Sequence, residues 1–248
     1  MQDSGLYQEP LGQERKGGYG IYIFLACLIF LALFFRFWWT DNFSGVEVDG
    51  ASMNQTLQDG DKLLMRYVEN GEGLKRGDVI VVDVQQYANQ PDNRYPFGNT
   101  KYLIKRLIAV EGDFVKCIDG QIYICYAGTY EEGTPIEQLT FEPLDEPYAY
   151  YRSDESKQAY DFENQIYEVG EGEIFFLGDN RNNSMDSRYK EASGSHLKGL
   201  YKATDVYGVV PEWAIEHRNI LEKIFFRDNQ KEETHTSLNI NNKGETLL

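Results

Sequence analysis

The feature that most constrains this chain is an apolar run from Tyr19 to Trp39, in which Arg36 is the only charged residue. As an α-helix, these 21 residues would extend about 31 Å, which matches a bilayer hydrocarbon core of ~30 Å. Aromatic residues stand at both ends, where they favour the membrane interface. No A-x-A-like cleavage site follows, so we expect an uncleaved anchor rather than a removed signal peptide.

The charges around this run predict how it is oriented. Arg15 and Lys16 precede it, and Asp41 follows it. Because basic residues favour the cytoplasmic side, we expect residues 1–18 to form a cytoplasmic tail and the chain beyond Thr40 to lie outside the cell membrane. The lipid bilayer is therefore one expected partner, crossed once by residues 19–39.

The overall charge argues against a nucleic-acid partner, because the chain carries a formal net charge of -16 and phosphate binding needs clustered Lys and Arg. Much of the acidity is local. Between Thr129 and Glu173, 13 Asp and Glu residues accompany only Arg152 and Lys157. We expect residues 127–170 to be a solvated acidic insertion between two β-rich halves.

Short runs rich in Val, Ile, Tyr and Phe and bounded by Gly, Asp and Asn follow the anchor, which is typical of β-strands. The expected strands lie within residues 45–50, 61–68, 78–84, 102–110, 113–118, 121–126, 173–180 and 205–210. No alternation of strands with helices occurs, so we expect antiparallel sheets and a mainly β fold with one N-terminal transmembrane helix.

The C-terminal part predicts one helix and a disordered tail. Pro211 can open a helix that runs to about Phe226, either packed on the sheet or lying on a membrane surface. Its apolar positions at near-helical spacing are Trp213, Ile220, Leu221 and Ile224. Residues 227–248 are polar and are expected to be disordered.

Two of the three cysteines flank a predicted turn. Asp119-Gly120 favours a hairpin that would place Cys117 near Ile122 rather than opposite Cys125. A disulfide between the two cysteines stays open but is not favoured.

A lysine within an apolar strand carries the first chemical signal. Leu103, Lys105 and Leu107 share one face of the strand expected at residues 102–110. Burial disfavours the charged amine and lowers its pKa, and a fall of ~3 from about 10.4 would make the neutral form common at pH 7. A neutral amine can take a proton from a serine hydroxyl. The alternative is a surface lysine that snorkels to solvent.

Three segments occur together in a telling order. SMNQTL begins at Ser52 just past the anchor, Lys105-Arg106 leads to the Gly112-Asp113 turn, and GDNRNNSMDSR spans residues 178–188. In this order they resemble the motifs of type I signal peptidases, and the third is nearly complete. The resemblance covers roughly residues 19–210.

The resemblance implies a Ser-Lys peptidase, with Ser52 as nucleophile, Lys105 as general base and the Ser184 hydroxyl orienting the amine. The residues it implies as supports of the site are Asp179, Asp186 and Arg188. From the residues alone, these supports could equally have a structural role, with a turn at Asp179-Asn180 and an ion pair between Asp186 and Arg188.

Several positions depart from the family pattern. Gln55 stands where the family usually has Pro, Ala109 where Gly is usual, and Glu111 where Pro is usual. Gly50 occupies a position where some relatives have a serine that assists the oxyanion hole. The hole would then rest mainly on the Ser52 backbone N–H.

The resemblance further implies an endopeptidase that removes N-terminal signal peptides from exported preproteins, with small residues one and three before the cut. It implies a catalytic β domain of residues 40–114 and 173–226, with residues 115–172 as an inserted smaller β subdomain. We expect no cofactor, and no metal, because the three histidines have no ligand spacing. The rivals are another Ser-Lys peptidase and a tethered, inactive binding scaffold.

Overall fold

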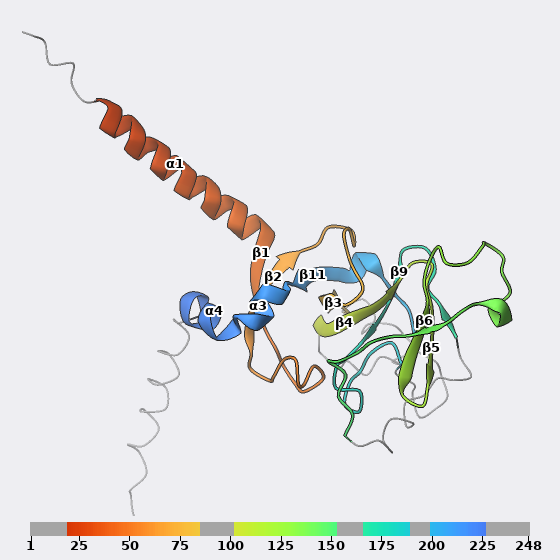
Figure 1. Cartoon of the computed structure of the whole chain (residues 1–248). Helices are drawn as coiled ribbons and strands as arrows, with labels where there is room; N and C mark the ends of the chain where they lie inside the picture. Colours follow the sequence, from red (N-terminus) through yellow and green to blue (C-terminus); the bar gives the residue numbers. More distant parts are fainter. Residues whose placement is uncertain (1–18, 85–101, 153–165, 189–198, 227–248) are drawn as a thin grey trace, which may run out of the picture. The chain divides into compact units, whose positions relative to one another are not determined.

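The computed structural model describes residues 19–84, 102–152, 166–188 and 199–226 (Figure 1). The chain divides into two compact units, residues 1–41 and 42–248. The expected cytoplasmic tail and the expected disordered tail both lie outside the described residues.

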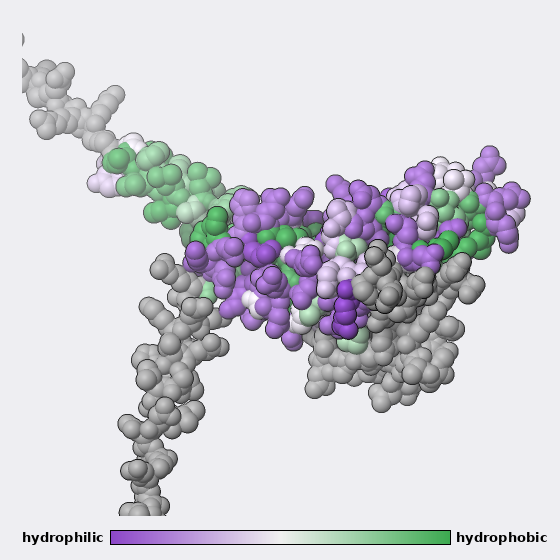
Figure 2. Space-filling model, turned by 60° about the horizontal axis from the view of Figure 1, so that its bottom comes forward, coloured by the Kyte–Doolittle hydropathy of each residue, from purple (hydrophilic) through white to green (hydrophobic). Residues whose placement is uncertain are grey.

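The helix α1, Tyr19–Asn42, belongs to the first unit except for its last residue, and none of its 24 residues is buried. Among the described residues it is the one helix long and apolar enough to cross a membrane, and Figure 2 shows its apolar surface. It ends three residues beyond the apolar run. There the Thr40 hydroxyl donates hydrogen bonds to the carbonyls of Arg36 and Phe37, at 3.2 and 3.0 Å, which satisfies acceptors of the last turns.

The second unit is built on a seven-stranded antiparallel sheet in the order β1-β2-β11-β3-β4-β9-β10 (Figure 1). Its strands are β1 (Phe43–Glu47), β2 (Lys62–Tyr67), β3 (Val79–Asp83), β4 (Tyr102–Val110), β9 (Glu173–Leu177), β10 (Tyr201–Lys202) and β11 (Val206–Val210). The strand β4, which carries Lys105, lies inside this sheet between β3 and β9. The mainly β, antiparallel prediction is confirmed.

A four-stranded antiparallel sheet in the order β7-β6-β5-β8 lies largely within residues 115–172, where the smaller subdomain was predicted. Its strands are β5 (Phe114–Ile118), β6 (Gln121–Cys125), β7 (Glu142–Pro143) and β8 (Tyr167–Glu168). Asp119 and Gly120 both have positive φ in the β5–β6 turn. Cys117 pairs with Ile122 as predicted, and no disulfide joins Cys117 and Cys125.

One apolar cluster lies on the large sheet, and a second one is shared by the two sheets. One face of the large sheet gathers Ile80, Leu103, Leu107 and Phe176. Another cluster joins Ile108, Ala109, Phe175 and Leu177 from β4 and β9 to side chains of the smaller sheet, Val115, Cys117, Ile122 and Ile124. The smaller sheet therefore packs within the same compact unit. The exact domain division at residues 115–172 stays a prediction.

The expected C-terminal helix is two helices. α3 spans Glu212–Glu216 and α4 spans Arg218–Phe225, with His217 between them in a non-helical conformation. Both contact β2, so the prediction that this segment packs on the sheet is confirmed. Only Ala214 and Leu221 are buried. Two 3₁₀ turns complete the described elements, η1 (Ile136–Gln138) and η3 (Ala203–Asp205).

Candidate active site

A cavity of about 880 Å³ lies in the second unit, lined by residues 46–53, 102–105 and 182–185. The first stretch is the end of β1 and the loop after it, the second is the start of β4, and the third follows β9. The three predicted motif segments therefore meet at one cavity, although they lie far apart in the sequence.

Ser52 and Lys105 are in direct contact in this cavity. The Nζ of Lys105 lies 2.7 Å from the Oγ of Ser52, and it donates a second hydrogen bond of 2.7 Å to the carbonyl of Ile104. Lys105 is 2% exposed. Burial lowers its pKa from 10.5 to about 8, against the opposing charges of Asp186 and Asp179. The sequence prediction of a buried lysine with a lowered pKa is confirmed.

The register of β4 explains why this lysine is buried. Leu103 and Leu107 are buried on the same face as Lys105, whereas Ile104 and Arg106 between them are more exposed. The partner strand β3 places Ile80 opposite Lys105. Apolar neighbours and a position inside the sheet keep water away from the amine, which is the physical origin of its lowered pKa.

Asp179 ties the nucleophile loop to β4. Its carboxylate accepts two hydrogen bonds from Arg106, of 2.8 and 2.6 Å, and one of 2.6 Å from the Thr56 hydroxyl. The side chain of Asp179 is fully buried. A buried carboxylate with three such donors is a rigid junction between the segment after Ser52 and the strand that carries Lys105.

Asp186 and Arg188 form a second buried pair. The guanidinium donates hydrogen bonds of 3.0 and 2.8 Å to the carboxylate, which also accepts the backbone N–H of Gly178 at 2.9 Å. Burial alone would raise the pKa of Asp186, but Arg188 and these hydrogen bonds outweigh it and hold the pKa below its ordinary value. The pair therefore stays ionised and holds the backbone N–H of Gly178.

Ser184 lines the cavity, but the expected hydrogen bond to Lys105 is not formed. Its Oγ is buried without a hydrogen-bond partner in the described structure, although it lies near enough to Asp186 to help lower the pKa of that carboxyl. Gly178 explains the close packing. A Cβ built there would stand 2.1 Å from the Ser184 Oγ and 2.6 Å from the Ser52 carbonyl.

Gly50 has a conformational role in the backbone and has no side chain that could bind the oxyanion. Its φ is +92°, and its N–H donates a 2.8 Å hydrogen bond to Asp59. Open space surrounds the position, so a serine would fit by volume but would be strained by the backbone. Within the described residues, the Ser52 N–H donates no hydrogen bond.

Sequence reasoning missed several residues that shape the site. The N–H of Asn180 donates to the Ser52 carbonyl at 3.0 Å, and its side-chain amide donates to the Ala51 carbonyl at 2.9 Å. Thr56, Arg106 and Arg181 were also not singled out. All lie inside the three motif segments, so the motifs themselves were the available signal.

The comparison with protein families agrees with this geometry. A family model described as signal peptidase, peptidase S26, matches residues 19–214. The chain belongs to this family.

Individual signal peptidase relatives support the assignment. A signal peptidase I of Bacillus licheniformis is 34% identical over 150 residues, which is 57% of this chain and 63% of the relative. The chain thus matches less than two thirds of that relative's length. A signal peptidase I of Streptococcus pneumoniae serotype 4 is 31% identical over 204 residues, 75% of this chain and 87% of the relative.

A solved signal peptidase I from Enterococcus faecalis V583 is 25% identical, with 56% of this chain and 98% of that chain covered and a TM-score of 0.31. In this S26 family member, no group of three or more His, Cys, Asp or Glu side chains among the described residues is placed to hold a metal ion.

Proposed function

We propose that this chain is a membrane-anchored serine endopeptidase that removes N-terminal signal peptides from exported precursor proteins. The observation that carries the proposal is the buried Lys105 amine, with a pKa of about 8, 2.7 Å from the Ser52 hydroxyl. At pH 7, about one such amine in ten is neutral and can accept the serine proton, whereas for an ordinary lysine the neutral fraction is only about one in 2,500.

The proposed mechanism assigns one role to each group. Neutral Lys105 takes the proton of Ser52 as its Oγ attacks the scissile carbonyl, and the Ser52 N–H stabilises the developing oxyanion. The resulting ammonium returns the proton to the leaving amine, which departs as the new N-terminus. Lys105 then deprotonates a water molecule that attacks the acyl-enzyme, and the ammonium gives this proton to the departing Ser52 Oγ, which regenerates both groups.

The supporting groups hold this arrangement. Asp179 and Asp186 are each paired with an arginine, so neither is an available proton acceptor near Lys105. We assign Ser184 to orienting the Lys105 amine once substrate is bound, because its hydroxyl is buried in the same cavity as the amine.

The cavity also favours a substrate class. Its walls combine apolar side chains of residues 46–53 with residues 102–105 of β4. An extended peptide presents alternate side chains to one wall, so the residues one and three before the cut would face it together. We propose that both must be small, as in exported preproteins.

The membrane topology is part of the proposal. We assign α1 to the cell membrane, with the N-terminus in the cytoplasm and the catalytic unit outside, because Arg15 and Lys16 lie on the N-terminal side. The enzyme would then meet precursors as they emerge from the lipid bilayer.

Cleavage of a synthetic precursor by the detergent-solubilised full chain tests the proposal. The wild type should release the signal peptide, whereas Ser52→Ala and Lys105→Met should not. Lys105→Arg should be equally inactive, because a guanidinium does not deprotonate in a protein. Appreciable turnover by the arginine variant, or no cleavage by the wild type, would contradict the proposal.

A further inference from the structure

A segment of the predicted acidic insertion runs directly beside the catalytic motif. We call residues 146–152 the strap and residues 178–182 the catalytic turn. The Tyr150 N–H donates to the Asp179 carbonyl at 2.7 Å, and the Arg181 N–H donates to the Tyr150 carbonyl at 2.9 Å. Tyr150 and Asn180 form a parallel bridge. The strap therefore pairs with the catalytic turn as a short extra strand would.

A buried ion pair fastens the strap to the turn. Arg181 is fully buried, and the Glu146 side chain is 7% exposed. The guanidinium donates to both carboxylate oxygens of Glu146 and, at 3.1 Å, to the Gly178 carbonyl. Because a buried arginine needs a counter-charge, Glu146 is what allows Arg181 to hold the Gly178 carbonyl from inside the protein.

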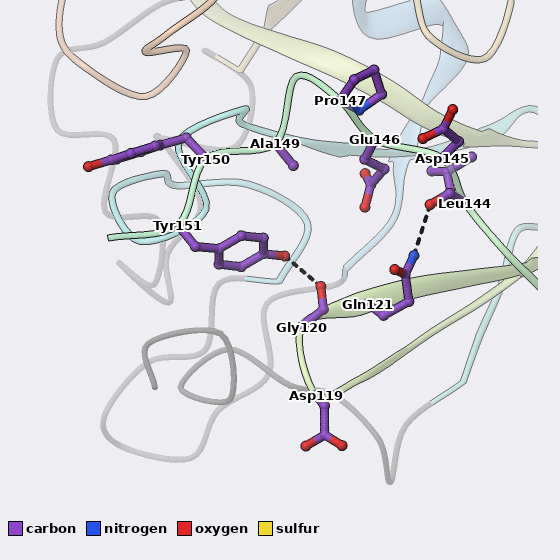
Figure 3. A pocket seen from close by; sticks show the side chains of 10 residues that line it. All are labelled: Asp119, Gly120, Gln121, Leu144, Asp145, Glu146, Pro147, Ala149, Tyr150 and Tyr151. Carbon is purple, nitrogen blue, oxygen red and sulfur yellow. Dashed lines mark hydrogen bonds between the residues drawn. The ribbon is translucent and has the colours of Figure 1, made fainter. Parts of the chain in front are cut away.

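Other contacts extend from the strap to neighbouring elements. The Tyr151 hydroxyl donates to the Gly120 carbonyl at 2.6 Å, which ties the strap to the β5–β6 turn (Figure 3). The ring of Tyr148 lies 3.9 Å from the guanidinium of Arg106, the residue that binds Asp179. The strap thus contacts the smaller sheet at Gly120 and β4 at Arg106, as well as the catalytic turn.

The catalytic turn in turn holds the nucleophile. Asn180 follows Asp179 and precedes Arg181, and it donates its backbone N–H to the Ser52 carbonyl and its side-chain amide to the Ala51 carbonyl. The orientation of the Ser52 backbone, and with it the N–H offered to the oxyanion, depends on where Asn180 sits.

We infer that Glu146 is a positioning residue for Ser52, acting through Arg181 and Asn180. This inference rests on the proposed peptidase function, and it gives the acidic insertion a role in the reaction rather than on the surface alone. A displacement of about 1 Å in a catalytic group can reduce a rate by ~100-fold, so contacts that fix Ser52 help to determine kcat.

Three variants separate positioning from stability. Glu146→Gln removes the counter-charge, and Glu146→Gln combined with Arg181→Met removes the buried charge as well and should restore folding stability. Asp113→Asn is the matched control, because Asp113 is a buried carboxylate paired with Arg76 at 2.6 Å and does not contact the strap or the catalytic turn.

The first readout is kinetics on a precursor peptide, with Tm measured for each full-length protein. Glu146→Gln should lower kcat by about 10- to 100-fold with KM within about twofold. The double variant should recover Tm but not kcat, and Asp113→Asn should lower Tm with kcat unchanged. Wild-type kcat in Glu146→Gln, recovery of kcat together with Tm, or an equal kcat loss in Asp113→Asn would overturn the inference.

The second readout does not depend on cleavage. Amide hydrogen exchange in residues 50–57 and 178–184 should become about tenfold faster in both Glu146 variants and stay unchanged in Asp113→Asn. If the wild type cleaves no precursor, the proposed function fails, yet exchange still decides whether Glu146 holds the Ser52 segment. Unchanged exchange there would overturn the positioning role.

Discussion

At Lys105, burial and charge act in opposite directions. Asp186 and Asp179 favour the ammonium, but desolvation is the larger effect and brings the pKa to about 8. Both carboxylates also serve an arginine each, at 2.8 and 2.6 Å. Both carboxylates near Lys105 are thus ion-paired with arginines. Lys105, with its lowered pKa, is therefore the group that can exchange a proton near neutral pH.

The same burial predicts a stability effect. A pKa lowered from 10.5 to about 8 corresponds to a penalty of ~3 kcal/mol on the charged amine in the folded state. Below about pH 8 the penalty is complete, and it disappears as pH rises towards 10.5, where the unfolded lysine also becomes neutral. Lys105→Met should therefore be more stable than the wild type at pH 7, by an advantage that shrinks by ~3 kcal/mol up to pH 11.

Denaturant unfolding at several pH values measures this difference. Lys75→Met, at an exposed position, is the control and should show no comparable trend. A Lys105→Met advantage that does not change with pH would mean that the lysine carries no burial penalty.

Gly178 gives a second test at the residue scale. A methyl group there would collide with the Ser184 Oγ and the Ser52 carbonyl, so Gly178→Ala should displace both and lower kcat/KM by at least ~100-fold. Gly170→Ala is the control, because a Cβ there meets only the carboxylate of Glu173 at 3.0 Å. Equal activity of the two variants would contradict the packing described for Ser184.

At the scale of elements, the runs of β-favouring residues and the turn residues between them predicted the long strands well. The nine residues of β4 coincide with the predicted run, and the β5–β6 hairpin has the predicted pairing. The two-residue strands β7, β8 and β10 carry no periodic signal and were missed. The break at His217 also escaped prediction, because the apolar spacing continues across it.

The sequence predicted the main residues of the site but not all of their contacts. Motif resemblance brought Ser52, Lys105 and the two aspartates together, but pairings between distant segments have no local pattern. Glu146 lies 35 residues from Arg181 in an acidic stretch that suggested only a solvated surface. Burial, which decides whether a carboxylate is a surface charge or a structural one, becomes visible only in the folded chain.

The position of β4 at the cavity leads to a prediction about substrate selectivity. Because residues 102–105 and 46–53 line one cavity, an extended peptide should present its residues one and three before the cut to the same wall. Replacing Ala by Phe immediately before the cut should remove most of kcat/KM. Phe two residues before the cut points the other way and should be tolerated. Equal losses at both positions would indicate a different binding mode.

At the scale of the whole molecule, one apolar helix and one β-rich unit make up the described chain. The proposed topology predicts that protease added outside intact cells digests the catalytic unit and spares a tag on the N-terminus. Permeabilised cells are the control, in which the tag is digested too. Loss of the tag from intact cells, with the catalytic unit protected, would reverse the orientation.

The central claim is that neutral Lys105 activates Ser52, and the pH dependence of kcat/KM tests it most directly. The substrate is one short precursor peptide without ionisable side chains, and folding is checked at each pH. The account predicts that kcat/KM rises with pH through about 8, the pKa of the buried amine, and levels off above it. At pH 5, only about one enzyme molecule in a thousand would hold the neutral amine, so activity should fall to that order of the plateau. Equal activity at pH 5 and pH 9 would contradict Lys105 as the base.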